Sequence, residues 1–260
     1  MIKSMKNAFD LTGKNAIVTG GNGGIGKHIS LALAEQGANV AIFCRNQEKA
    51  KKALEELSAF GGVYKSYYCD VGDPDSCKEA CAKVIEDYGK IDVLVNNSGI
   101  GCGGEILSMS DDFKMWLDVQ NIDLNGTLFM SYFIGKHMRD NGYGKVINIS
   151  SNSGDMVNKP QRMSPYNVAK AGVNMLTKCL AFEWGEYGIR VNAIAPGFTM
   201  AGFADNMPQA AIDEMTAKIP VGRFGEGIEI GALAVYLASE ASDQMTGAIL
   251  TIDGGYCLAN

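Results

Sequence analysis

The chain has 260 residues, of which 47% are hydrophobic and 20% charged, and its formal net charge is −6. This excess of carboxylates argues against nucleic acid as the main partner, because binding to phosphates needs a basic face. The hydrophobic content suffices for a sizeable core, and the 32 glycines with only 6 prolines fit many tight turns rather than a disordered chain.

The sequence gives no indication of a targeting segment, a membrane span or a metal site. Residues 1–14 have neither the apolar core nor the small-residue cleavage site of a signal peptide, and no apolar run approaches the roughly 20 residues of a membrane span. The seven cysteines show no CxxC pairs, and only His28 and His137 are available to join them as metal ligands. We therefore expect a reduced, metal-free cytoplasmic protein.

Short apolar runs alternate with longer amphipathic stretches along the chain. The runs are residues 15–19, 39–44, 63–68, 91–95, 145–150, 189–195 and 248–252. Several are nearly continuous Val, Ile and Ala, as expected of parallel strands covered on both faces. The alternation predicts an α/β fold, a doubly wound parallel sheet of about seven strands with helices on both faces. No linker or repeat is present, so we expect one domain over residues 1–260.

The first predicted strand-to-helix turn reads TGGNGGIG (19–26). Glycines at the start of a helix let a pyrophosphate approach the free backbone amides there. The spacing differs from the commoner G-x-G-x-x-G, and tight packing alone also explains a glycine-rich turn. Its position at the first strand-to-helix turn favours dinucleotide binding.

The end of the second predicted strand, IFCRN, bears on the choice of cofactor. An acidic residue there binds the adenosine ribose of NAD, whereas an arginine accommodates the 2′-phosphate of NADP. Cys44 occupies the acidic position and Arg45 follows it. A solvated charge at a helix start also explains Arg45, but the pattern favours NADP(H) over NAD(H).

Tyr166 and Lys170 lie four positions apart in SPYNVAK (164–170). In a helix they project from one face about one turn apart. An ammonium beside a phenol favours the phenolate, which lets the tyrosine exchange a proton with an alcohol. Alone, YxxxK is a weak motif, and an exposed helix face explains it more simply.

Taken together, the motifs resemble the short-chain dehydrogenase/reductase family. They are TGGNGGIG (19–26), NNSG (96–99), ISS (149–151), YNVAK (166–170), PG (196–197) and DGG (253–255). The resemblance covers nearly the whole chain and implies a seven-stranded Rossmann-like sheet, a nicotinamide dinucleotide and an assembly that is often a homotetramer, with a homodimer as the alternative. DLNG, SGDMVNKPQRMSPYN and FEWG further resemble the branch with sorbose reductases, mannitol 2-dehydrogenases and xylulose-reductase-like enzymes. In that branch, extra residues between the serine and the tyrosine lie beside the substrate.

The resemblance implies catalytic roles for Ser151, Tyr166 and Lys170. Tyr166 matches the acid/base, Lys170 the residue that assists it and holds the nicotinamide ribose, and Ser151 the residue that hydrogen-bonds the substrate oxygen. Ser150 and Ser153 are rivals for the serine role, although hydroxyls that cap turns explain both more simply.

Asp123 departs from the family pattern W…NLxG, because it stands where an asparagine is usual. Asp123 is a candidate catalytic residue that acts either through its side chain or through its backbone and a water molecule. Asn125 is an alternative contributor, and a plain helical carboxylate explains Asp123 equally well.

The resemblance also implies a set of cofactor contacts and a substrate lid. The contacts are Gly20, Asn22, Gly24, Ile25, Gly26, Arg45, Asp70, Asn97, Gly99, Tyr166, Lys170, Pro196, Gly197 and Thr199. Thr199 is the weakest match, because the family's threonine comes three or four residues after the glycine. The lid spans about residues 198–222 and is rich in Met and Phe, Phe203 among them, although packing of a short helix explains these residues almost as well.

These expectations combine into an NADP(H)-dependent carbonyl reductase/alcohol dehydrogenase. It moves a hydride between the nicotinamide and a secondary alcohol or ketone, and the expected substrate is a ketose or polyol. One alternative is a steroid or bile-acid hydroxysteroid dehydrogenase. The other is a dinucleotide-binding regulator that has lost catalysis, which the intact Ser151, Tyr166 and Lys170 argue against.

Overall fold

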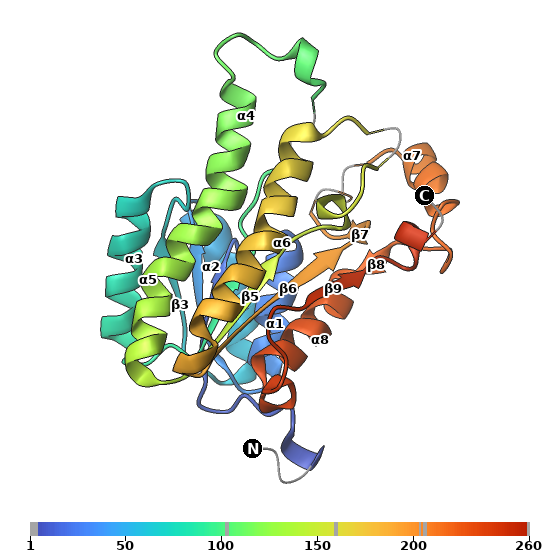
Figure 1. Ribbon diagram of the computed structural model, residues 1–260. Coiled ribbons are helices and arrows are strands. Elements are labelled where there is room, and N and C mark those ends of the chain that lie inside the picture. The colour runs from blue at the N-terminus through green and yellow to red at the C-terminus, as the bar shows by residue number, and fades with distance from the viewer. Residues whose placement is uncertain (1–4, 102–103, 159–160, 203, 205–206, 259–260) are drawn as a thin grey trace.

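The computed structural model describes residues 5–101, 104–158, 161–202, 204 and 207–258. Seven parallel strands form one sheet in the order β3-β2-β1-β4-β5-β6-β9 (Figure 1). They are β1 (Asn15–Thr19), β2 (Asn39–Cys44), β3 (Tyr64–Tyr68), β4 (Val93–Asn96), β5 (Gly144–Ile149), β6 (Ile189–Pro196) and β9 (Ile249–Ile252). The predicted single-domain, seven-stranded Rossmann-like sheet is confirmed, and each strand lies within two residues of its predicted run.

Helices cover both faces of this sheet (Figure 1). One face carries α1 (Gly24–Glu35), α2 (Gln47–Leu57) and α8 (Gly227–Ala238), and the other carries α3 (Pro74–Tyr88), α5 (Gly126–Asn141) and α6 (Ser164–Trp184). A further helix, α4 (Lys114–Val119), continues into α5 through a π-helical turn, Gln120–Asn125. Short 3-10 turns lie at Met5–Asn7, Ser58–Phe60, Ile106–Ser108, Asn152–Gly154, Gly185–Tyr187, Glu240–Ser242 and Tyr256–Leu258. Among the described helices, none has the length and apolarity needed to cross a membrane.

The unbroken apolar runs follow from burial on both faces. Within β1, Val18 packs with the helices of one face and Ile17 with those of the other. In β2, Ile42 and Phe43 divide in the same way. Because successive strand residues point to opposite faces, a strand covered on both sides favours apolar residues at most positions.

The helices begin where the sequence supplies caps. The Asn46 side chain accepts a hydrogen bond from the Lys49 backbone at 2.9 Å at the start of α2, and the Asp73 side chain accepts one from the Asp75 backbone at 3.0 Å before α3. Pro74 occupies the first helical position, where a missing N–H costs nothing.

The strand order places a crevice at the carboxyl ends of the strands. The chain runs outward from β1 through β2 to β3 and then returns to β4 on the other side of β1. The connections that leave β1 and β4 therefore diverge, and ligands of doubly wound folds bind at such a switch point. A two-stranded ribbon of β7 (Thr199–Met200) and β8 (Gly225–Glu226) follows β6, with α7 (Gln209–Thr216) between its strands.

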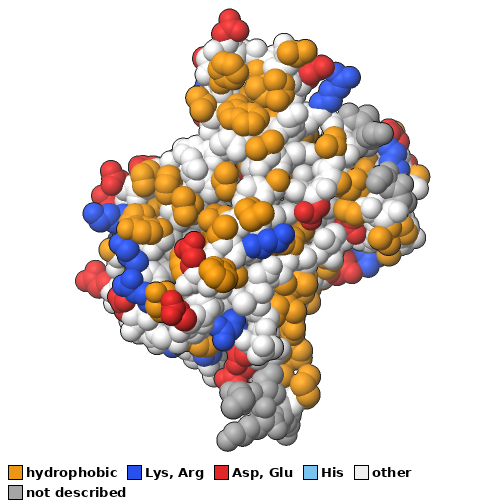
Figure 2. All heavy atoms as spheres, in the orientation of Figure 1, with side chains coloured by type: hydrophobic (Ala, Val, Ile, Leu, Met, Phe, Trp, Pro, Cys, Tyr) orange, Lys and Arg blue, Asp and Glu red, His pale blue; other side chains and the backbone are white. Residues whose placement is uncertain are grey.

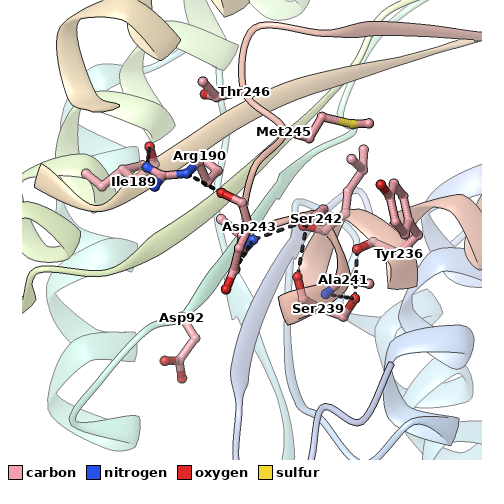
Figure 3. A network of polar contacts seen from close by, with 12 residues as sticks. Asp92, Ile189, Arg190, Tyr236, Ser239, Ala241, Ser242, Asp243, Met245 and Thr246 are labelled. Atoms are coloured by element: carbon pink, nitrogen blue, oxygen red, sulfur yellow. Dashed lines mark hydrogen bonds and ion pairs between the residues drawn. The ribbon is translucent and has the colours of Figure 1, made fainter. Parts of the chain in front are cut away.

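At the other end of the sheet, polar contacts hold a buried lysine. The Lys145 side chain, near the start of β5, is 2% exposed; its Nζ lies 2.8 Å from Asp243 Oδ1 and donates to Ser242 Oγ at 3.2 Å. Arg190 Nε donates to the backbone carbonyl of Asp243 at 2.7 Å, which fixes the turn that carries the carboxylate (Figure 3). Burial lowers the pKa of Lys145, and Asp243 offsets only part of that shift.

Replacing Asp243 with alanine leaves the Lys145 ammonium buried without a counter-charge. We expect Asp243→Ala to lower the free energy of unfolding by about 1–3 kcal/mol, less than for a fully buried pair because this carboxylate is half-exposed and water partly replaces it. Lys145→Met should cost less, and the double variant should be more stable than Asp243→Ala alone. Urea unfolding of the three variants measures this, and a double variant less stable than Asp243→Ala contradicts it.

Candidate active site

A cleft of about 580 Å³ lies at the carboxyl ends of the strands. Its walls come from the turns after β1, β2, β3 and β4, from the segments after β5 and β6, and from the first turns of α6. Every predicted catalytic or cofactor-binding residue lines it except Gly26. Residues from across the chain thus converge on one site.

The glycine turn brings backbone close to backbone. Gly20 adopts a positive φ of 66°, which glycine tolerates best. A side chain on Gly26 would collide with the carbonyl of Gly20 and the amide of Asn97. Gly26 therefore serves the packing of α1 against the turn, whereas Asn22, Gly24 and their neighbours line the cleft.

Charged side chains gather where the turns after β2 and β3 meet. Arg45 is 60% exposed, and its Nη1 lies 3.6 Å from Asp70 Oδ2, an ion pair of little strength at this exposure. The buried Cys44 leaves no carboxylate at the end of β2. Lys49, in the first turn of α2, also lines the cleft and forms no ion pair within the described residues. Sequence reasoning missed this second cation, although its position four residues after Arg45 at a helix start was a usable signal.

The turn after β4 is fixed to the end of β1. Thr19 Oγ1 accepts hydrogen bonds from the backbone amides of Asn97 and Ser98, each at 2.9 Å, and the Asn97 side chain donates to the Thr19 carbonyl at 2.9 Å. A Cβ on Gly99 would lie 2.8 Å from Asp123 Oδ2. This position therefore requires glycine because a carboxylate lies against it.

Tyr166 and Lys170 lie on the first two turns of α6, as predicted. The Lys170 ammonium is 5.4 Å from the centroid of the Tyr166 ring and donates to the Ile149 carbonyl, at the end of β5, at 3.0 Å. The lysine side chain is 5% exposed. Its ammonium is thus held between the tyrosine and the strand end.

Asp123 completes this arrangement. It lies in the π-helical turn, a conformation that is frequent at functional sites. Its fully buried carboxylate accepts a hydrogen bond from the Ile100 amide at 2.8 Å through Oδ1, and its Oδ2 lies 3.2 Å from Lys170 Nζ. The contact between Asp123 Oδ2 and Lys170 Nζ is an ion pair whose geometry is not that of a hydrogen bond. Burial acts to lower the pKa of Lys170, but the attractions of Asp123 and Tyr166 outweigh it, so this pKa is raised.

The structure bears on the two alternatives to the Asp123 side chain, which are the Asp123 backbone carbonyl and the Asn125 side chain. The Asp123 carbonyl already accepts the Thr127 hydroxyl at 2.9 Å. The Asn125 side chain bonds Asn121 at 3.4 Å and does not line the cleft. The carboxylate of Asp123, rather than the Asn125 amide, therefore reaches the site.

The three neighbouring serines have different environments. Ser150 Oγ donates to Asn174 Oδ1 at 2.6 Å, which anchors α6 to the strand end. Ser151 Oγ accepts the Ser153 amide at 3.1 Å, and Ser153 Oγ accepts the Asn158 side chain at 2.6 Å. The hydroxyl of Ser151 has only a long contact to an acceptor, Asn152 Oδ1 at 3.5 Å, so its proton is available to a substrate oxygen in the cleft.

The segment after β6 supplies an apolar wall. Pro196, Gly197 and Thr199 line the cleft, and Thr199 Oγ1 donates to the Gly197 carbonyl at 3.2 Å. The expected lid contributes apolar residues to the same wall, and Phe203 lies outside the described residues. The apolar residues of this wall are Phe198, Ala201, Ala204, Met207 and Phe224. Of these, Phe224 falls two residues beyond the predicted lid.

The segment between Ser151 and Tyr166, which the resemblance places beside the substrate, supplies a polar wall whose members the sequence did not identify one by one. Its members are Asn152, Ser153, Asn158 and Gln161. The unusual length of this segment was the available signal. Within the part of the chain that the structure describes, no three His, Cys, Asp or Glu residues gather as metal ligands would.

Comparison with known proteins agrees with this geometry. The family model described as enoyl-(acyl carrier protein) reductase matches residues 20–257. An NADP-dependent mannitol dehydrogenase of Alternaria alternata is 40% identical over 98% of this chain and 96% of its own length, and a sorbose reductase of Candida albicans is 37% identical over 95% and 88%. A gluconate 5-dehydrogenase of Burkholderia cenocepacia, solved with NADP and tartrate, superposes with a TM-score of 0.91 at 32% identity, covering 98% of this chain and 99% of that one.

One conclusion follows from four observations. They are the order of the strands, the glycine turn, the meeting of Ser151, Tyr166 and Lys170, and the relatives that match over nearly their full length. The chain belongs to the short-chain dehydrogenase/reductase family.

Proposed function

We propose that this protein is an NADP(H)-dependent carbonyl reductase/alcohol dehydrogenase that interconverts a ketose and a polyol. The observation that carries the proposal is the meeting of Ser151, Tyr166 and Lys170 in the cleft that also contains the glycine turn. The relatives named as mannitol dehydrogenase and sorbose reductase support the substrate class. A panel of ketoses, diketones and keto-steroids, followed by NADPH oxidation, tests it, and a non-catalytic regulator would turn over none of them.

The residues of the cleft fit a nicotinamide dinucleotide with a 2′-phosphate. Gly24 opens α1, whose first backbone N–H groups lack partners within the helix, and a Cβ on Gly23 would meet nothing within 4 Å. Both features suit a pyrophosphate. Arg45 and Lys49 offer two cations for the extra phosphate. The bound cofactor supplies or accepts the hydride.

Tyr166 and Ser151 handle the proton and the oxygen of the substrate. We assign Tyr166 as the acid that protonates the carbonyl oxygen during reduction and the base that removes the proton during oxidation. Ser151 donates a hydrogen bond to the same oxygen and stabilises the charge that develops on it. The Lys170 ammonium, 5.4 Å from the Tyr166 ring, favours the phenolate that remains after proton transfer.

Asp123 is a positioning residue in this scheme. Its carboxylate balances the charge of Lys170 at 3.2 Å and holds the turn after β4 through the Ile100 amide. A buried ammonium without such a partner tends to lose its proton. Asp123 therefore keeps Lys170 charged next to Tyr166.

We assign residues 198–222 as the substrate lid, an assignment supported by the apolar side chains that they bring to the cleft. The ribbon formed by β7 and β8 ties the start of this segment to the chain just beyond it. The lid supplies an adaptable apolar cover over a site whose opposite segment is polar.

We also propose a homotetramer in the cytoplasm. Hydrophobic side chains gather over α4, α5 and α6 on one face of the molecule (Figure 2), as expected of a surface that a second copy covers. Those exposed on α5 and α6 are Leu128, Tyr132, Val168, Met175 and Phe182, the last 91% exposed. Each of the six cysteines among the described residues is a free thiol, which suits a reducing compartment.

Replacing Tyr166 with phenylalanine keeps the ring and removes the hydroxyl. Because the proton transfer then has no donor, we expect kcat for ketose reduction to fall by about 10²–10⁴-fold while NADPH still binds. Steady-state kinetics and NADPH fluorescence titration measure the two effects. Turnover within a few fold of the wild-type value would remove Tyr166 from the mechanism.

Replacing Asp123 with alanine leaves burial as the main influence on the pKa of Lys170, and burial lowers it. Lys170 then loses its proton at lower pH than in the wild type, so the alkaline limb of the kcat/KM profile should move to lower pH. At neutral pH we expect a loss of about tenfold or less. Asp123→Asn, which keeps an acceptor for the Ile100 amide, should shift the limb in the same direction.

The pH–rate profiles of the wild type and both Asp123 variants provide the test. A folded variant with an unchanged alkaline limb contradicts the positioning role. Complete inactivation of folded Asp123→Asn would instead assign the carboxylate a direct part in proton transfer.

Replacing Arg45 with alanine removes a cation from the 2′-phosphate, which NADH lacks. We expect the dissociation constant of NADPH to rise about tenfold or more and that of NADH to change little. Lys49→Ala should act in the same direction, and added salt should narrow the wild-type preference because these cations are exposed. Lys51→Ala is the matched control, since Lys51 pairs with Glu48 on the same helix and does not line the cleft.

Fluorescence titration of both cofactors measures these constants. Wild-type protein that binds NADH as tightly as NADPH would refute the cofactor assignment drawn from IFCRN.

A further inference from the structure

Two amides in the polar wall of the cleft have an unused hydrogen-bonding atom, a donor on Asn152 and an acceptor on Asn158. Asn158 is 6% exposed and lines the cleft, and its Nδ2 donates to Ser153 Oγ at 2.6 Å. Its Oδ1 is buried and has no hydrogen-bond partner within the described residues. Turning the amide over exchanges the two atoms but still leaves one of them unpaired. Buried polar groups are normally satisfied, so this atom requires an explanation.

Nearby asparagines that do not line the cleft are paired. The Asn167 side chain donates to the Met156 carbonyl at 3.1 Å. The Asn174 side chain donates to Asp155 at 3.1 Å and accepts the Ser150 hydroxyl at 2.6 Å. The unpaired acceptor of Asn158 is therefore a property of the cleft and not of the segment as a whole.

Asn158 is also linked to the reacting end of the cleft. It donates to Ser153, and the Ser153 amide donates in turn to Ser151 Oγ at 3.1 Å. Two hydrogen bonds thus separate its amide from the hydroxyl assigned to the substrate oxygen. Gln161 lines the same cleft, and its side chain makes no hydrogen bond within the described part of the chain.

We propose that Asn158 is a specificity-determining residue that accepts a hydrogen bond from a hydroxyl of a polyhydroxylated ketone whose carbonyl lies at Ser151. This inference rests on the proposed function and narrows it. A ketose carries a hydroxyl on the carbon next to its carbonyl, which matches an acceptor placed two hydrogen bonds from Ser151. A site with an unsatisfied buried acceptor discriminates strongly against an analogue that has no hydroxyl to offer.

The test compares two ketones of equal length, D-fructose and 2-hexanone, which carries no hydroxyl. Both are reduced with NADPH by the wild type and by Asn158→Leu, which keeps the size of the side chain and removes its polar atoms. We expect kcat/KM for D-fructose to fall about 10-fold to 100-fold, mainly through KM, and that for 2-hexanone to stay within about threefold. The ratio of the two values within one preparation does not depend on the fraction of folded protein.

Two further variants separate substrate recognition from structure. Asn158→Ala should reproduce the change in ratio if the leucine variant folds poorly. Asn141→Leu introduces the same substitution at the carboxyl end of α5, where the side chain donates to the His137 carbonyl at 2.7 Å, away from the cleft, and should leave the ratio unchanged.

The outcomes distinguish this inference from the function on which it rests. Equal losses on both ketones, or no loss on either, would overturn the role of Asn158 and leave the proposed function intact. Wild-type enzyme that reduces 2-hexanone but no ketose would refute the proposed function and the hydroxyl recognition with it.

Discussion

The ion pair between Lys170 and Asp123 is the contact on which the rest of the site depends. Neither side chain is appreciably exposed, so each would bear a large desolvation cost without the other. The Lys170 ammonium also bonds the Ile149 carbonyl at the end of β5, and Asp123 also bonds the Ile100 amide. A single pair of charges thereby joins α6, the π-helical turn, β5 and the turn after β4. It also explains why Gly99, whose Cβ would lie against the carboxylate, has no side chain.

A buried ammonium lies at each end of β5, Lys145 from the strand itself and Lys170 from α6, and the two differ in what surrounds them. Lys145 pairs with Asp243, a half-exposed carboxylate, and burial remains the dominant influence on its pKa, which is lowered. Lys170 pairs with a fully buried carboxylate and has a tyrosine beside it, and its pKa is raised. The pKa of the same residue type is therefore shifted in opposite directions by its surroundings, a fully buried carboxylate and a tyrosine beside Lys170 and a half-exposed carboxylate beside Lys145.

The fold could be predicted from the sequence alone because the patterns that indicate it are short and local. A strand covered on both faces favours apolar residues at most positions, so the seven runs were visible without any contact information. The glycine turn and the Tyr166–Lys170 pair lie within short motifs. The contact between Asp123 and Lys170 joins residues 47 positions apart, and the sequence showed only that an asparagine was missing. The role proposed for Asn158 depends on which of its side-chain atoms remains unpaired in three dimensions, and no pattern in one chain reports that.

The residues assigned to the reaction and the residues that form the walls of the cleft come from different kinds of structure. The reacting groups lie at strand ends and on the first turns of α6, where sheet and helix fix them. The walls come from connecting segments, a polar one after β5 and an apolar one after β6. Because a connection tolerates substitution better than a strand, the walls can change without moving Tyr166 relative to Lys170. A ketose, the proposed substrate, has hydroxyls that the polar wall can bind. In the role proposed for Asn158, a ketone without a hydroxyl next to its carbonyl leaves the Asn158 acceptor unpaired, and that cost would make the site selective.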